Sequence, residues 1–149
     1  MARETLLTLD CSSYSDNITD IIKVLNDAGW IFRNDIMEYL PLHDDDNYDW
    51  QEEQLSCEKL FGIVSEKQKN GELAGVILYH RDSDRGIILL AGSTKEIMIA
   101  PDINRKLLID DVRNNCDFTD ISWYIMNICV ELQKRGCTLE SIMCHDCIG

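Results

Sequence analysis

The chain has 149 residues, of which 45% are apolar, 27 are acidic and 14 are basic, so that its net charge is −13. This length corresponds to a single domain, and the apolar content can fill a core, which excludes a chain that is disordered throughout. No apolar run approaches the roughly 20 residues that cross a bilayer, and the first residues lack the pattern of a signal peptide. The seven cysteines follow no disulfide framework and indicate free thiols. We therefore expect one cytoplasmic domain over residues 1–149.

Short strands and helices alternate in the predicted first half of the chain. Residues 5–11 form an apolar strand, and Ser15 can cap a helix over residues 16–28, where apolar side chains recur at helical spacing. A second strand covers residues 36–42. Residues 43–53 then form a polar, acidic loop.

A helix capped by Ser56 and ended by Gly71 leads into the second half. Four strands follow, over residues 73–80, 86–91, 96–100 and 104–109. Thr119 caps the longest helix, which runs to about residue 135, and residues 138–144 form a last strand. This order predicts an α+β fold, namely a mainly antiparallel sheet of about five to six strands with three helices packed on it.

The negative charge is concentrated near the start of the chain. Residues 1–58 carry 14 acidic and 3 basic side chains, whereas residues 59–149 carry 13 acidic and 11 basic ones. Such a one-sided field repels nucleic acid and anionic membranes, and it attracts basic proteins and speeds their encounter. The basic residues are dispersed and form no stripe that could bind phosphates. An ordinary role for this acidity, keeping the chain in solution, stays open.

The acidic loop of residues 43–53 holds six carboxylates, two aromatic side chains and no lysine or arginine. Clustered carboxylates can pair with the lysines and arginines of a partner's phosphate-binding cleft, and exposed aromatic residues are frequent anchors of interfaces. We therefore predict a partner-binding site made of Asp44, Asp45, Asp46, Tyr48, Asp49, Trp50, Glu52 and Glu53. The alternative is a solvated loop whose Trp50 is part of the core.

No metal or cofactor site is expected. A calcium-binding EF-hand loop starting at Asp45 would have Trp50 where the sharp turn needs glycine and Ser56 where the bidentate ligand needs glutamate. The cysteines and the histidine within residues 137–147 match no zinc-ligand spacing, so that we expect a frayed tail with free thiols there.

No catalytic residues are expected either. The three histidines, His43, His80 and His145, lie in no recognised catalytic motif, and the chain has no glycine-rich phosphate loop and no nucleophile elbow. This pattern favours a binding protein over an enzyme.

Two stretches resemble the immunity proteins of bacterial contact-dependent growth inhibition systems. One is the Ser122-Trp123-Tyr124-Ile125 start of the long helix, and the other is Glu38-Tyr39-Leu40-Pro41-Leu42-His43-Asp44-Asp45-Asp46-Asn47-Tyr48-Asp49-Trp50. The resemblance extends to the size, acidity and layout of the whole chain. It implies a cytosolic antidote without catalytic residues, which binds a basic toxin domain, often a nuclease, and occludes its active site.

Two other classes of function remain open at this stage. One is an acidic mimic of nucleic acid, or a regulatory module, that acts on a DNA-binding protein of the host. The other is a small metal-binding or redox protein that uses the cysteines near the C-terminus.

Overall fold

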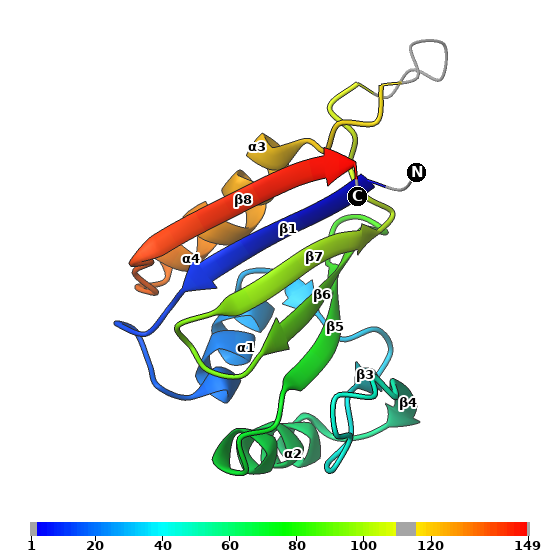
Figure 1. Cartoon of the computed structure of the whole chain (residues 1–149), viewed down its shortest axis with the longest axis vertical. Helices are drawn as coiled ribbons and strands as arrows, with labels where there is room; N and C mark the ends of the chain where they lie inside the picture. The colour runs from blue at the N-terminus through cyan, green and yellow to red at the C-terminus, as the bar shows by residue number, and fades with distance from the viewer. Residues whose placement is uncertain (1–2, 110–115, 149) are drawn as a thin grey trace.

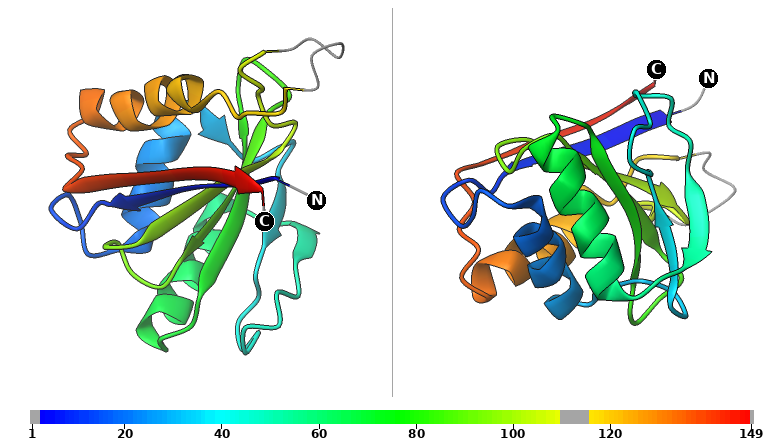
Figure 2. Two further views of the ribbon diagram at one scale, coloured as in Figure 1. Left: turned by 45° about the horizontal axis from the view of Figure 1, so that its top comes forward. Right: turned by 90° about the horizontal axis from the view of Figure 1, so that it is seen from below.

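An antiparallel sheet of eight strands, with the helices on one side of it, makes up the fold (Figures 1 and 2). The computed structural model describes residues 3–109 and 116–148. The strands are β1 (Arg3–Asp10), β2 (Trp30–Ile31), β3 (Ile36–Tyr39), β4 (Gln51–Gln54), β5 (Ala74–His80), β6 (Gly86–Ala91), β7 (Ile97–Ile103) and β8 (Ser141–Ile148). The helices are α1 (Ile18–Asp27), α2 (Cys57–Lys69) and a long helix made of α3 (Ile121–Tyr124), the π-helical η2 (Ile125–Val130) and α4 (Glu131–Lys134).

The strand order places the two ends of the chain side by side. The sheet runs β4-β3-β5-β6-β7-β1-β8, and the short β2 pairs with β5 outside this path. β1 is therefore an inner strand, and it pairs antiparallel with β8 over all eight of its residues, from Arg3 opposite Ile148 to Asp10 opposite Ser141. β4 forms one edge of the sheet and β8 forms the other (Figure 1). The β4 edge has four residues and the β8 edge has eight.

Alternate side chains of the strands form the core together with the helices. Leu7 and Leu9 of β1 are fully buried, while Thr8 between them is only half-buried, as the period of two in a strand requires. The same core contains Ile18, Ile21, Ile22 and Leu25, four completely buried residues of α1. Each such side chain contributes about 1.5–3 kcal/mol on burial. The predicted apolar face of this helix is thus confirmed.

The α+β class and the antiparallel sheet are confirmed, but the predicted number of strands was too low. The two-residue β2 was not predicted. Nor was β4, because its sequence Gln-Glu-Glu-Gln is polar and its first three residues belong to the predicted acidic loop. The prediction of a strand over residues 104–109 is wrong, because β7 ends at Ile103 and these residues form no strand. Asn104 has a φ of +49°, which turns the chain out of β7, and the isolated bridge of Leu107 to Thr119 is the strand-like pairing that the described part of this segment retains.

Two helix starts and the last strand also differ from the sequence prediction. Ser15 does not cap α1; its hydroxyl accepts the Asn17 N–H and donates to Asp20, so that the helix begins later. The long helix is capped by Asp120 and not by Thr119. The predicted frayed tail is instead the second half of β8, which continues to Ile148 because it follows β1.

A buried tryptophan ties the sheet to the π-helical part of the long helix. Trp30 is completely buried, and its indole N–H donates to the Asn127 carbonyl at 2.9 Å. A buried indole N–H needs such an acceptor. The acceptor here is a backbone carbonyl of the π-helical stretch, where the regular α-helical hydrogen-bond pattern is interrupted. The Trp30 ring also contacts His80 and Trp123, with ring centroids 5.0 and 6.1 Å away.

None of the helices in the described parts of the chain has the length and apolar character needed to cross a membrane.

Two glycines offer a matched test of the packing. A Cβ at Gly75 of β5 would lie 2.7 Å from Leu40 Cδ1, whereas a Cβ at Gly62 of α2 would meet nothing within 4 Å. We expect Gly75→Ala to destabilise the fold by about 1–3 kcal/mol, because Leu40 is buried and cannot move freely. Gly62→Ala should stabilise it by about 0.5–1 kcal/mol through helix propensity. Urea unfolding of both variants measures this, and equal effects would contradict the packing described.

Candidate protein-binding site

The acidic segment predicted from the sequence forms the connection between β3 and β4 and the first residues of β4. Asp44 does not point to solvent as the sequence prediction requires. It is only 6% exposed, and its carboxylate accepts the backbone N–H groups of Tyr48 and Asp49, each at 2.9 Å. Asp44 therefore holds the loop together and is not available to a partner.

The loop has an unusual backbone. His43, Asp45, Asp46 and Tyr48 have φ angles between 52° and 59°, in the left-handed region that non-glycine residues seldom adopt. Such a conformation persists only when surrounding contacts maintain it. Here the bonds to the Asp44 carboxylate and the bond from the Asn47 N–H to the Asp44 carbonyl maintain it. The loop consequently has a defined shape.

A buried lysine of α2 anchors the start of the loop. Lys67 is 1% exposed, and its Nζ donates to the Pro41 carbonyl at 2.5 Å and lies 3.5 Å from the Glu72 carboxylate. Glu72 in turn accepts the His43 N–H at 2.6 Å. Burial opposes ionisation of Glu72, but the bonds from Asn70 and His43 and the charge of Lys67 together hold its pKa below the usual value. The acidic loop is thus attached to the C-terminal end of α2.

Three of the predicted aspartates and one aromatic residue are accessible on this loop. Asp45, Asp46 and Asp49 are exposed, and Tyr48 is 52% exposed. Asp45 and Asp46 also line a cavity of about 250 Å³, which the loop forms with the end of α2. Trp50 is half-buried and lies outside the core. It is therefore neither a fully exposed anchor nor the core residue of the alternative interpretation.

The remaining predicted residues, Glu52 and Glu53, are exposed on β4 but point to opposite faces of the hairpin. Glu53 contacts Tyr39; burial, with this carboxylate adding to it, raises the pKa of the Tyr39 hydroxyl. Glu52 lies directly opposite Glu38, an arrangement of like charges that disfavours strand pairing. The eight predicted residues therefore do not form a single face.

The exposed carboxylates are not neutralised by ion pairs within the described part of the chain. Among the ion pairs that residues 3–109 and 116–148 form with one another, none includes Asp45, Asp46, Asp49, Glu52 or Glu53. We define these five residues and Tyr48 as the acidic surface, which extends over both faces of the β3–β4 hairpin because Glu52 and Glu53 lie on opposite sides of it. Its carboxylates are available to cations outside the chain.

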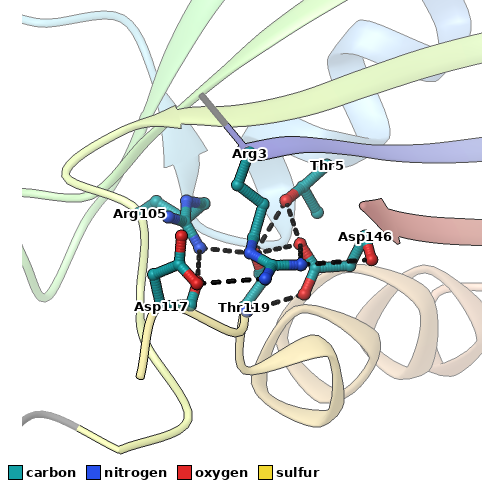
Figure 3. Close-up of polar contacts among 6 residues, drawn as sticks. All are labelled: Arg3, Thr5, Arg105, Asp117, Thr119 and Asp146. Atoms are coloured by element: carbon teal, nitrogen blue, oxygen red, sulfur yellow. Dashed lines mark hydrogen bonds and ion pairs between the residues drawn. The ribbon is translucent and has the colours of Figure 1, made fainter. Parts of the chain in front are cut away.

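Sequence reasoning missed a second polar cluster, in which β1, β8 and the start of the long helix meet (Figure 3). The Asp146 carboxylate accepts the Thr119 N–H at 2.9 Å and the Thr5 hydroxyl at 2.8 Å. Arg3 bonds to Asp117 at 3.0 Å, and Arg105 bonds to Thr119 at 2.7 Å. Most of these groups satisfy one another, which indicates a structural role; the exception is the Arg3 Nε, which is buried without a hydrogen-bond partner among the described residues. A single aspartate within the presumed tail gave no signal for it.

The thiols and histidines do not form a metal site in the parts of the chain that the structure describes. Cys144 and Cys147, the C-x-x-C pair, lie three residues apart on β8 and so point to opposite faces of the sheet. His80 lies against Trp30, where burial chiefly lowers its pKa.

No known protein family, characterised protein or solved structure matches the chain. The geometry of the acidic surface is therefore the best guide to function.

Asp44 and Asp45 provide a matched pair of variants for the loop. Asp44→Asn should lower the free energy of unfolding by about 1–2 kcal/mol, because an amide can accept only through its single oxygen and loses its bond to one of the two backbone N–H groups. Asp45→Asn should change it little, since that side chain is exposed. Urea unfolding at neutral pH measures both. Equal stability of the two variants would show that Asp44 does not hold the loop.

The Asp146 cluster predicts a pH dependence of stability. Burial opposes ionisation of Asp146, but hydrogen bonds from Thr119 and Thr5 and the charge of Arg3 hold its pKa below the usual value. The stabilisation is therefore complete above about pH 4, the ordinary pKa of an unfolded aspartate, and is lost as the pH falls through the lower folded-state pKa. Asp146→Asn should be less stable than the wild type at pH 7, and the difference should shrink below pH 4. Urea unfolding across this range measures it; a constant difference would contradict the assignment.

Proposed function

We propose that the protein is an immunity-type inhibitor, which binds a basic toxin domain through the acidic surface and acts in the cytoplasm of the cell that makes it. The observation that supports this most strongly is that five exposed carboxylates on one hairpin have no cation of their own among the described residues. A toxin that cleaves nucleic acid holds phosphates with lysines and arginines. Carboxylates of fixed geometry compete for the same cations.

The energetics of the hairpin are consistent with selection for binding. The left-handed backbone of the loop and the Glu38–Glu52 pair both cost folding free energy. In return, the loop has its shape before any partner arrives, because Asp44 and Lys67 fix it. A surface ordered in advance loses little conformational entropy on binding, so that more of the contact energy appears as affinity.

Within this proposal, Tyr48 is the aromatic anchor. It is more exposed than Trp50 and lies between Asp46 and Asp49 in the sequence. An aromatic ring that becomes buried near the centre of an interface is a common binding hot spot. The carboxylates around it steer the approach of a basic partner.

The proposal is tested first by protection. The chain should rescue cells that produce the toxin encoded directly upstream of its gene, and it should block that toxin at equimolar amounts in vitro. Failure against this toxin, or the absence of a toxin gene, would overturn the immunity proposal. Capture of a DNA-binding protein of the host in place of a toxin would instead support the regulatory module.

Association kinetics then test the acidic surface. The triple variant Asp45→Asn, Asp46→Asn and Asp49→Asn keeps Asp44 and should fold normally. Its association with the toxin should slow by about tenfold at low salt, with a flatter salt dependence, because exposed charges mainly affect encounter rates. Surface plasmon resonance at several salt concentrations measures this. An unchanged rate and salt slope would exclude the loop from the interface.

Tyr48→Ala should act differently, by accelerating dissociation at least about tenfold while association changes little. Tyr14→Ala is the control, since Tyr14 is also an exposed tyrosine, at 41%, but lies in the connection from β1 to α1. Similar effects of the two substitutions would remove Tyr48 as the anchor.

A further inference from the structure

The two edges of the sheet are protected to different degrees. Free strand edges expose unpaired N–H and C=O groups, and proteins usually shield them with short strands, charges or proline. β4 has only four residues and carries Glu52 and Glu53. β8 has eight residues, with no lysine, arginine or proline among them, and its one carboxylate, Asp146, accepts hydrogen bonds from Thr5 and Thr119 within the molecule. The edge formed by β8 is therefore long and open to pairing.

Apolar side chains accompany the open edge on both faces of the sheet. Met143, on the face away from the helices, is 68% exposed. On the other face, Ile142 borders an apolar groove of about 350 Å³ between β8 and the long helix, with Ile125 and Val130 on the helix side. The helix lies behind β8 and is visible beyond its outer edge (Figure 1). Its Met126 is 57% exposed.

We propose that β8 pairs with β8 of a second copy of the chain, antiparallel about a two-fold axis, so that two sheets join into one. A two-fold axis brings the same strand edge and the same helix together from both copies, which makes the contact self-complementary. The outward N–H and C=O groups of each β8 would pair with those of the other. Side chains near Ile142 and Met126 would be covered at the same time.

A stable dimer requires more area than two strand edges provide, so that the contact should include both the β8 strands and the long helices. An eight-residue strand is roughly 27 Å long, and a sheet edge about 10 Å thick presents only about 270 Å² over that length. A specific interface covers about 800 Å² on each partner. The strand alone is too small, so that the long helices must also meet. Helices pack at 8–10 Å between axes, a separation compatible with helices placed just beyond paired strands.

The distribution of charge supports a second copy as the occupant. Residues 121–148, which form the long helix and β8, carry only three acidic and two basic side chains, although the chain as a whole has a charge of −13. The acidic surface lies at the opposite edge of the sheet. Pairing through β8 keeps the two acidic surfaces far apart and leaves them accessible. This dimer does not depend on the proposed function.

The test is the oligomeric state of the full chain in reducing buffer, measured by sedimentation equilibrium from low to high micromolar concentrations. The wild type should form dimers with increasing concentration. Ile142→Lys places a charge at the groove, and Met143→Lys places one on the opposite face of the same strand; each should weaken dimerisation at least about tenfold. Ile36→Lys, at a side chain on β3 that is 39% exposed, should leave it unchanged.

A monomer at every concentration would overturn the proposal, and so would a dimer that neither β8 substitution weakens. Hydrogen exchange gives an independent readout, because the outward amides of residues 141–148 should become protected as the dimer forms. If Ile142→Lys fails to fold, Met143→Lys still decides, since Met143 is largely exposed. Dimers that persist with unprotected β8 amides would place the interface elsewhere.

Discussion

Alternate side chains of β1 and β7 are buried in the core beneath the helices, and the positions of the two edges of the sheet follow from this one-sided packing. Leu7 and Leu9 lie opposite Ile99 and Ile97, and all four are fully buried. Since a shift by one residue would expose the whole set, the register in the middle of the sheet is fixed. The strands added outward from this centre end in an acidic hairpin at one edge and in an apolar strand at the other.

The acidic hairpin depends on the same core through α2. Leu60 and Val64 attach this helix to the core, and Lys67, one turn further on, reaches the backbone before the acidic loop. Burying a charged lysine costs folding free energy unless its ammonium group is paired and hydrogen-bonded. The Glu72 carboxylate and the Pro41 carbonyl provide these partners for Lys67. The geometry of the exposed aspartates is therefore set by contacts that lie inside the molecule.

The sequence predicts those parts of the fold whose periodicity comes from burial. α1, β5 and β6 are examples, because their apolar side chains alternate or recur as the core requires. β4 could not be predicted, since it is a strand through its pairing with β3 and not through apolar side chains.

Within the predicted binding site, the sequence located the loop but could not distinguish three consecutive aspartates. Only the fold shows that Asp44 turns inward while Asp45 and Asp46 face outward. Likewise, nothing local indicated that Asp146 would accept hydrogen bonds from Thr5 and Thr119, because those partners are distant in the chain.

The adjacency of β1 and β8 has a consequence for biosynthesis. β1 is synthesised before the other strands of this sheet, yet one of its two neighbours, β8, is synthesised after all of them. Until then, the edge of β1 that will receive β8 stays unpaired. Bringing β8 back to β1 closes a loop that extends from Asp10 to Ser141. The entropy cost of closing this loop is offset only when the two strands have paired. The sheet is therefore completed only after β8 has been synthesised.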